Sequence, residues 1–348
     1  MYELYLTSLN IISKNNMPRT GFEPATPCLE GKCSIQAELP RRLDTIIIKI
    51  SFKSVFLSEK VFNWGNIKWI MLTKGVDKLK FPLKGKYVIM VAPSFVTDFS
   101  YPSIIYKLKK LGFDKVVEMT FGAKMVSREY HKKLKNSRKM LISSTCPGIV
   151  ATIENRYPEL KKNLAKIDSP MVAMGKICRK EFPKHKVVFL SPCNFKKIEA
   201  GKTKYVDYVI DFDELKELFK VHKIKKPLLS KKMKFDKFYN DYTKIYPLGG
   251  ALAKTAHLKG VIEEKECESI DGVQHVMKFF AKDQGKTKFL DCLFCEGGCI
   301  GGPHTNKELS IRRKTKKIMN YLKKSRRENI PEDRKGLVSK AKGLKFSK

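Results

Sequence analysis

The sequence predicts an α/β fold of two lobes, each with a mainly parallel sheet flanked by helices. The chain has 348 residues, and its 42% hydrophobic content is sufficient for one large or two ordinary folded domains. From Tyr87 onward, short apolar runs typical of buried strands alternate with segments of helical spacing. Such alternation favours parallel sheets that are covered by helices on both faces. The chain contains no run of eighteen apolar residues, so we expect no membrane span.

The apolar pattern places the expected elements along the chain. The strands predicted for the first lobe are residues 87–92, 115–119, 139–143 and 185–190, and its helices are 104–111, 123–134 and 170–181. The strands predicted for the second lobe are 205–210, 260–262, 267–270 and 288–291, and its helices are 211–220 and 273–282. A basic helix is expected from Ile311, and residues 235–257 have no regular pattern.

This pattern divides the chain into four parts. Residues 1–70 are expected to be a poorly structured extension, residues 71–192 the first lobe, 193–310 the second lobe and 311–348 a basic tail. The segment from Thr20 to Cys33 resembles a peptide that arises when a transfer-RNA gene is conceptually translated, which makes Met71 a plausible true start. Cys28 and Cys33 have the spacing of half a metal site, but no second pair lies nearby.

The net charge of +36 favours an acidic partner, either an electron-carrier protein or a nucleic acid. An alternative is that lysines simply solvate the whole surface. The basic residues run from Lys74 to Lys348 and form no patch with interleaved aromatic residues, which speaks against a nucleic-acid partner.

The cysteines carry the main chemical signal. The chain has nine cysteines and no secretory signal, which favours metal ligands over disulfides and a cytoplasmic location. Four of them closely follow predicted strands: Cys146, Cys193, Cys295 and Cys299. Side chains at the carboxyl ends of parallel strands can converge on one point. Because thiolates are the preferred ligands of iron–sulfur clusters, we expect these four to hold a [4Fe–4S] cluster.

Other interpretations of the cysteines and histidines remain open at this point. Cys178 and Cys267 fall in a helix and a strand pattern, where we expect small buried side chains. Cys292, Cys295 and Cys299 could bind zinc, although only one C-x2-C step is present. Among six histidines only His304 follows the last cysteine closely, and we expect it to cap a helix or lie at the surface.

Three motifs in order resemble those of the iron-only ([FeFe]) hydrogenase large subunit, in its C-terminal domain. They are Ser144-Thr-Cys146-Pro-Gly148, Ser191-Pro-Cys193-Asn-Phe-Lys196-Lys-Ile-Glu199, and Asp291-Cys-Leu-Phe-Cys295-Glu-Gly-Gly-Cys299-Ile-Gly-Gly302. The similarity runs from about Tyr87 to His304. The resemblance implies that a cubane sits between the two lobes. It also implies that Cys299 bridges the cubane to a two-iron centre with CO and cyanide ligands. Lys196 would then donate a hydrogen bond to a cyanide. Without the resemblance, we would interpret Lys196 as a solvated surface lysine.

The departures from the family pattern limit the expected activity. The residue before the first ligand is a proton-transferring cysteine in active members and is Thr145 here. A hydroxyl is a far weaker acid than a thiol, whose pKa is about 8.5, so Thr145 is a poor substitute. Tyr130 stands where the family's proton path has a carboxylate, with Glu129 adjacent. The single-cysteine first motif resembles the sensory branch of the family.

Three functions therefore compete. The chain could be a hydrogenase-type oxidoreductase of weak activity, a hydrogen or redox sensor, or a non-catalytic [4Fe–4S] protein. No C-x2-C-x2-C-x3-C relay motif occurs in the sequence, so we expect electrons to come from an acidic carrier such as ferredoxin. Hydrogenase maturation proteins would be partners if the two-iron centre is inserted, and no membrane partner is expected.

Overall fold

Two parallel sheets form the frame of the protein. The computed structural model describes residues 75–137, 139–225, 233–240 and 242–347. The four-stranded sheet has the order β2-β1-β4-β5 and the three-stranded sheet the order β3-β7-β6, and every pairing is parallel. The strands are β1 (Tyr87–Val91), β2 (Lys115–Glu118), β3 (Leu141–Ile142), β4 (Lys186–Ser191), β5 (Tyr208–Asp211), β6 (Cys267–Asp271) and β7 (Phe289–Leu293). The predicted α/β class is confirmed.

The two sheets do not divide at residue 192, where the sequence placed the boundary between the lobes. Strand β3 leaves the first predicted lobe and pairs with β7, with Leu141 opposite Phe289. Strand β5 leaves the second predicted lobe and pairs with β4, with Val188 opposite Tyr208. The chain therefore passes between the two sheets more than once, and each sheet contains strands from both predicted lobes.

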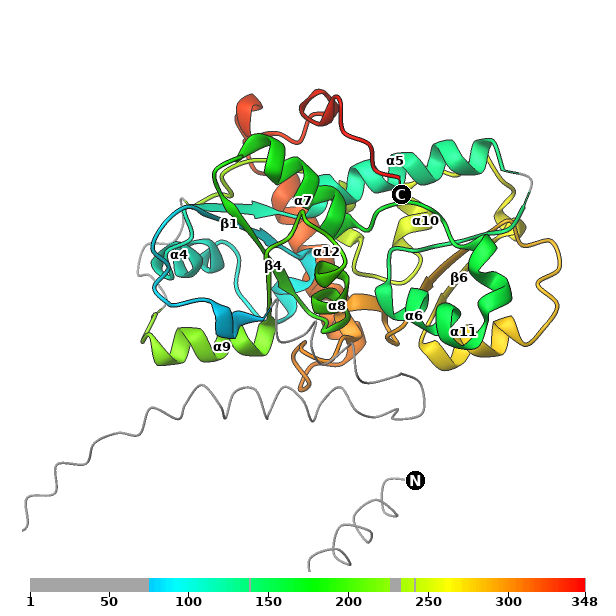
Figure 1. Ribbon diagram of the computed structural model, residues 1–348, viewed down its shortest axis with the longest axis horizontal. Coiled ribbons are helices and arrows are strands. Elements are labelled where there is room, and N and C mark those ends of the chain that lie inside the picture. Colours follow the sequence, from blue (N-terminus) through cyan, green and yellow to red (C-terminus); the bar gives the residue numbers. More distant parts are fainter. Residues whose placement is uncertain (1–74, 138, 226–232, 241, 348) are drawn as a thin grey trace, which may run out of the picture. The chain divides into compact units, whose positions relative to one another are not determined.

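Helices cover both sheets, as Figure 1 shows. They are α4 (Ser103–Lys110), α5 (Thr120–Lys135), α6 (Pro147–Arg156), α7 (Pro170–Glu181), α8 (Phe195–Gly201), α9 (Phe212–Val221), α10 (Ala251–Thr255), α11 (Val273–Phe280) and α12 (Ile311–Arg326). Helices α4, α7 and α9 pack on strands of the four-stranded sheet, and α6 and α11 pack on the three-stranded sheet. None of the helices in the described ranges is both long and apolar enough to traverse a bilayer.

Alternation along β1 explains why helices lie on both faces of the larger sheet. Val88 and Met90 point into a core shared with α5 and α7, whereas Ile89 and Val91 point into a core shared with α4, α9 and α12. All four side chains are fully buried. A strand that is apolar at every position is the expected pattern for a central parallel strand, because neither face meets water.

The C-terminal segment is part of the fold. Helix α12 buries Ile318, Tyr321 and Leu322, and Phe346 is buried in the core shared with α5 and α7. The prediction that residues 311–348 form a tail is therefore wrong for 311–347, because apolar side chains spaced along this segment find core positions.

Most predicted elements are confirmed to within a few residues. The strand expected at 260–262 is wrong, since these residues form turns around Gly260, which has φ +77°. Helices α8 and α10 were missed because they have only seven and five residues, and α6 because its first turn contains Pro147 and Gly148. The expectations for residues 1–70, Cys28, Cys33 and Met71 lie outside the described residues.

Candidate metal centre

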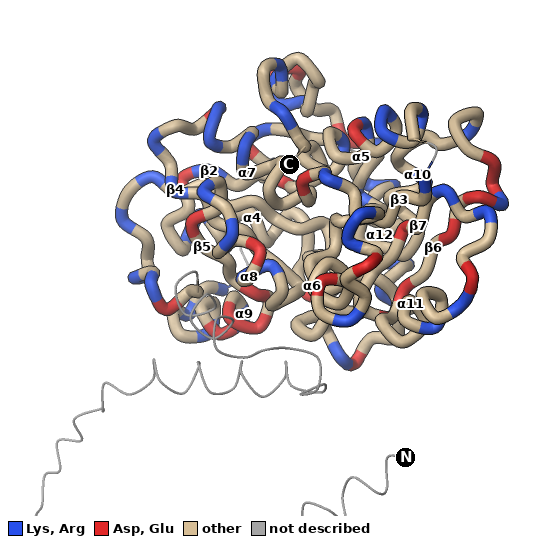
Figure 2. The backbone as a smooth tube through the Cα atoms, turned by 45° about the vertical axis from the view of Figure 1, so that its right-hand side comes forward, with Lys and Arg blue, Asp and Glu red and all other residues tan. Residues whose placement is uncertain are grey.

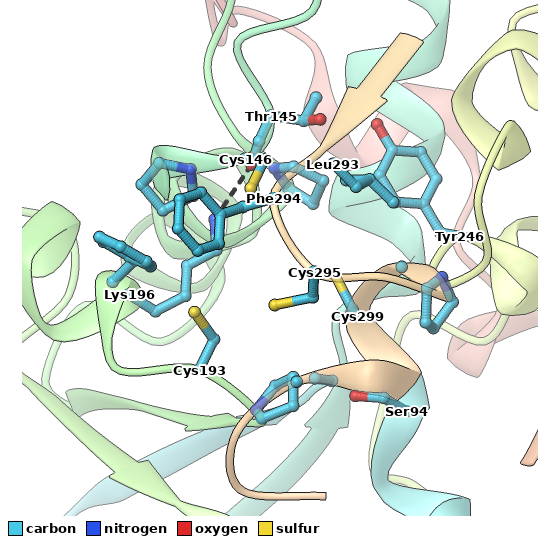
Figure 3. Close-up of a pocket in the computed structure, with 18 of the residues that line it drawn as sticks. Ser94, Thr145, Cys146, Cys193, Lys196, Tyr246, Leu293, Phe294, Cys295 and Cys299 are labelled. Carbon is cyan, nitrogen blue, oxygen red and sulfur yellow. Dashed lines mark hydrogen bonds between the residues drawn. The ribbon is translucent and has the colours of Figure 1, made fainter. Parts of the chain in front are cut away.

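Four cysteines from both sheets converge on one cavity (Figure 3). Cys146 follows β3, Cys193 follows β4, and Cys295 and Cys299 lie in the loop after β7. The loops that carry them therefore extend from the carboxyl ends of strands in two different sheets. The cavity measures about 80 Å³. A single water needs roughly 10–15 Å³, so the cavity accommodates a group of many atoms.

The spacing of the sulfur atoms favours a larger cluster over a single ion. In the described part of the chain, no three cysteine sulfurs all lie within 4.8 Å of one another. Tetrahedral zinc, with Zn–S bonds of about 2.3 Å, would hold its sulfurs only about 3.8 Å apart. Four thiols on a common cavity at wider spacing match a polynuclear cluster instead. The donor set and its spacing thus fit a cubane.

Cys146 and Cys193 both lie at helix starts. Cys146 is the N-cap residue of α6, and Pro147 is the first residue of that helix. Cys193 lies two residues before α8. Burial raises the pKa of its thiol, and the backbone N–H groups of Phe195 and Lys196 offset part of that rise. The positive end of a helix stabilises a thiolate, so both positions favour metal-bound sulfur.

The loop that carries Cys295 and Cys299 is shaped by glycines. Gly298 has φ +74°, and a Cβ there would lie 2.5 Å from the Pro247 carbonyl oxygen. A Cβ on Gly301 would lie 1.8 Å from the carbonyl oxygen of Glu296. Because no side chain fits either position, glycine is required to bring Cys299 to the cavity. The Cys299 N–H then donates to Pro247 O at 2.8 Å.

The thiols are held in an environment that suits a cationic group. Burial, followed by the nearby Cys146, raises the pKa of Cys193 to about 12. Burial, Cys146 and Cys193 likewise raise the pKa of Cys299 to about 12. Burial and the other three cysteines raise the pKa of Cys295 well above its ordinary value. Iron binding would displace these protons, and positive iron would remove the repulsion among four thiolates.

Lys196 and Thr145, the two candidate catalytic residues from the sequence, also line the cavity. The Lys196 ammonium bonds Glu199 at 2.7 Å and donates to Thr145 O at 3.3 Å. Burial lowers the pKa of Lys196, but the Glu199 carboxylate outweighs it and the net pKa is raised. The alternative of a solvated lysine is wrong, because only 14% of its side chain is exposed.

Ser94 is a lining residue that the sequence did not single out. It lies in the 3-10 helix Pro93–Thr97 after β1, is 1% exposed, and its hydroxyl has no hydrogen-bond partner among the described residues. A buried hydroxyl without a partner that lines a cavity is a candidate donor to whatever fills the cavity. The sequence did contain a signal for Ser94 as a site residue, because this serine closely follows a buried strand, as the cysteines do.

Tyr130, which the sequence comparison placed at a family carboxylate position, is buried and hydrogen-bonded to Ser144. Tyr130 is fully buried, and its hydroxyl accepts from the Ser144 N–H at 2.8 Å and lies 3.2 Å from the Ser144 hydroxyl. Burial raises the Tyr130 pKa despite these bonds. Glu129 instead pairs with Lys132 at the surface, at 2.9 Å. Glu129 therefore does not take the place of Tyr130 beside Ser144.

The other three cysteines in the described ranges, Cys178, Cys267 and Cys292, do not line the cavity. Cys292 is buried against α6 and α11, with its sulfur 3.7 Å from the Ser143 hydroxyl. Because Cys292 is not at the cavity, the alternative of a zinc site on Cys292, Cys295 and Cys299 is not supported. Cys178 is buried in α7 as expected, while Cys267 is half-buried on the edge strand β6.

His304 is buried, so the expected surface role is wrong. Its Nδ1 lies 2.8 Å from an Asp213 carboxylate oxygen and 3.5 Å from Asp211. These three groups are close enough for a metal ion. Lys197 and Lys216, however, already pair with the two carboxylates, which makes a further cation unfavourable. His304 instead ties the segment after Cys299 to the start of α9.

Asp291, which begins the third motif, gives a pH-dependent prediction. Burial raises its pKa from 3.8 to about 6, although backbone N–H groups of Ala253 and Leu252 lower it. The folded state then binds the proton more tightly, so the free energy of unfolding falls as pH rises from about 4 to about 6. Asp291→Asn removes the cost of ionising this buried carboxyl. We therefore expect it to raise the free energy of unfolding by about 3 kcal/mol at pH 7.5 and by roughly half of that at pH 5. Urea unfolding of the cluster-free protein at both pH values checks this; an equal difference at both would contradict it.

The family comparison agrees with this geometry. Residues 85–303 match the family described as "Iron only hydrogenase large subunit, C-terminal domain". The chain belongs to this family. Iron hydrogenase 1 of Clostridium pasteurianum is 28% identical over 258 residues, covering 57% of this chain and 45% of the relative. NADP-reducing hydrogenase subunit HndD of Solidesulfovibrio fructosivorans is 27% identical over 139 residues, covering 32% and 24% respectively. The chain thus spans less than half of these hydrogenases.

Solved structures of [FeFe]-hydrogenase share the fold. The apo form of HydA1 from Chlamydomonas reinhardtii, as a cysteine-to-histidine variant, is similar with a TM-score of 0.54 at 16% identity. That match covers 78% of this chain and 90% of the other. A glutamate-to-alanine variant of the same hydrogenase gives a TM-score of 0.53 with the same identity and coverage.

Proposed function

We propose that this hydrogenase-family chain holds a [4Fe–4S] cluster on Cys146, Cys193, Cys295 and Cys299. The observation that carries the proposal is the convergence of four thiols on one cavity, at a spacing wider than a single zinc ion would need. The family membership of residues 85–303 supports it. When bound, the cluster supplies one-electron redox chemistry.

The proposal extends to a linked two-iron centre, with Cys299 as the shared ligand and with maturation proteins as the partners that insert it. Cys299, Lys196, Thr145 and Ser94 line the same cavity, which supports the extension. In this role the Lys196 ammonium and the Ser94 hydroxyl donate hydrogen bonds into the cavity. The apolar Met119 and Leu293, which also line the cavity, exclude water from it.

We further propose that the chain interconverts protons and hydrogen slowly. Thr145 offers only a hydroxyl beside the first ligand, and the Tyr130 hydroxyl is held by Ser144 and has a raised pKa. A positioned acid of suitable pKa contributes typically 10²–10⁴-fold to a rate. Thr145 and Tyr130 lack that pKa, so the protein is expected to fill the site but to turn over poorly.

Replacing Thr145 by cysteine tests this account of the rate. We expect Thr145→Cys to raise hydrogen evolution by about tenfold or more, since a thiol of pKa near 8.5 can move a proton at neutral pH. Thr145→Ser keeps a hydroxyl and is the matched control, for which we expect no increase. Hydrogen would be measured after reduction, on protein matured with the two-iron unit and checked by infrared bands of CO and cyanide.

Two outcomes would revise the proposal. Absence of the infrared bands in otherwise iron-loaded protein would leave a [4Fe–4S] protein without hydrogen chemistry. Bands with no hydrogen from either Thr145→Cys or the wild type would favour the second candidate, a hydrogen or redox sensor. The observation that favours a sensor is that the Tyr130 hydroxyl is held by the Ser144 N–H and has a raised pKa, while Thr145 offers only a hydroxyl.

A further inference from the structure

A second pocket lies where α5, the carboxyl end of α12 and two irregular segments meet. It measures about 370 Å³. Small-molecule sites typically measure roughly 300–1,000 Å³. Its walls come from Lys124 of α5, from the end of α12 and the residues that follow it, from Tyr239 and Asn240, and from residues 335–337. Among the described residues it shares none with the lining of the cysteine cavity, so the proposed cluster does not account for it.

Backbone hydrogen bonds fix the wall that contains Tyr239. Its N–H donates to Arg334 O at 2.9 Å, and the Gly336 N–H donates to Tyr239 O at 2.8 Å. A Cβ on Gly336 would lie 2.7 Å from the Phe121 ring, so this close approach requires glycine. From the α5 side, the Lys124 ammonium donates to Gly336 O at 3.4 Å. The wall is therefore already built in the unliganded protein, which lowers the cost of ordering a site on binding.

The charged residues of the lining are mainly basic. In the described ranges four are cationic and one is acidic: Lys124, Lys244, Arg326 and Lys335 against Glu328. Lys244 is already held in the core by Glu118, so it contributes least to the pocket. Lys335 pairs with Glu332, but these side chains are 47% and 67% exposed, and such exposed pairs contribute little stability. Lys335 can therefore turn to a ligand, and the lining as a whole favours an anion.

Two neutral donors of the same wall are buried and find no acceptor in the described part of the chain. Tyr239 is 7% exposed, and its hydroxyl has no hydrogen bond there. The nearby Tyr101 hydroxyl donates to Glu328 instead, at 2.9 Å. The Asn240 amide nitrogen is also unpaired, although its oxygen accepts from the Tyr242 N–H at 3.0 Å. Buried donors without acceptors are unfavourable, and ligand oxygens at this wall would satisfy them.

We propose that this pocket binds a small sugar phosphate. The phosphate would lie among Lys124, Arg326 and Lys335, because a dianion gains most where several cations converge and a guanidinium offers two parallel donors.

The neutral part of the lining suits the sugar. Its hydroxyls would accept from Tyr239 and Asn240, which an inorganic anion held by the cations would leave unpaired. Ile330 and Leu337, which also line the pocket, would cover the carbon skeleton.

A pair of charge-neutralising changes tests the phosphate part. We expect Lys124→Gln with Arg326→Gln to weaken binding of ribose 5-phosphate to the full chain by about tenfold or more. The control is Lys133→Gln with Arg327→Gln, which removes the same charge from exposed residues of α5 and of the end of α12 that do not line the pocket. For this control we expect unchanged binding. Basic residues are spread over most elements in Figure 2, so the control separates the pocket from total charge.

Tyr239→Phe tests the sugar part, because it removes one hydroxyl and no charge. We expect it to weaken binding of ribose 5-phosphate by about threefold or more and to leave binding of inorganic phosphate unchanged. Thermal unfolding of each variant checks that it folds. If the charge-neutralised pair does not fold, the Tyr239→Phe result decides.

Calorimetry would compare ribose 5-phosphate with ribose and with inorganic phosphate as separate probes, at about 0.15 M ionic strength. Ribose 5-phosphate bound at least about tenfold more tightly than either fragment, and weakened by the pocket pair alone, would support the inference. Inorganic phosphate bound as tightly would show an adventitious ion only and would overturn it. Equal weakening by both pairs, undiminished binding by Tyr239→Phe, or no binding of ribose 5-phosphate by the folded wild type would overturn it as well.

Discussion

Replacing Cys295 by serine is expected to abolish cluster binding. Cys295 lies in the loop after β7 and contributes one of the four thiols on the cavity. A cubane needs a ligand on each of its four irons, and a serine hydroxyl is a much harder and less acidic donor than a thiol. We expect iron content to fall from about four per chain to near zero, together with the brown absorbance. Iron analysis after anaerobic reconstitution measures this directly.

Cys267→Ser is the matched control for that experiment. Cys267 is half-buried on the edge strand β6 and does not line the cavity, so the same chemical change should leave iron content unaltered. If Cys295→Ser kept its iron, or if Cys267→Ser lost as much, the assignment of the ligands would be wrong.

The second large effect is expected at a buried ion pair that holds α12 to the core. Lys244 and Glu118 pair with exposed side-chain fractions of 1% and 0%. The Tyr321 hydroxyl of α12 donates to Glu118 at 2.7 Å, and the Lys244 ammonium donates to that hydroxyl at 3.2 Å. Lys244→Met would leave the Glu118 charge buried without its partner. Such losses cost about 3–5 kcal/mol. We therefore expect the midpoint of thermal unfolding to fall by roughly 10 °C.

The double variant Glu118→Gln with Lys244→Met separates loss of the pair from loss of packing. Because it removes both charges, it should recover most of the stability that the single variant loses. A Lys244→Met protein as stable as the wild type would show that Glu118 is not held as a buried charge. A double variant no better than the single one would assign the loss to packing.

The sequence predicted the class of fold because its strands are apolar and its helices amphipathic. It did not predict which strands pair. Strand β3 has only two residues and pairs with β7, which lies far along the chain, and no spacing in the sequence encodes that partner. The division at residue 192 was wrong for this reason. Likewise, Glu118, Lys244 and Tyr321 meet only in three dimensions.

The residues of the candidate site were easier to predict from the sequence than the pairing of the strands. A cysteine that follows a buried strand must lie near the carboxyl end of that strand. The structure places Cys146, Cys193 and Cys295 at such ends. Ser94 was overlooked because a serine in a turn is common, and what sets it apart is a buried hydroxyl that no group in the described ranges pairs with. His304 was misjudged because its partner Asp213 lies on α9, 91 residues earlier.

The central claim is tested most directly by the metal content of the wild-type protein. Anaerobically reconstituted protein should contain at least about four irons and four acid-labile sulfides per chain, and reduction should give the electron paramagnetic resonance signal of a [4Fe–4S] cluster. Zinc in place of iron, or iron without sulfide, would contradict the claim that Cys146, Cys193, Cys295 and Cys299 hold a cubane.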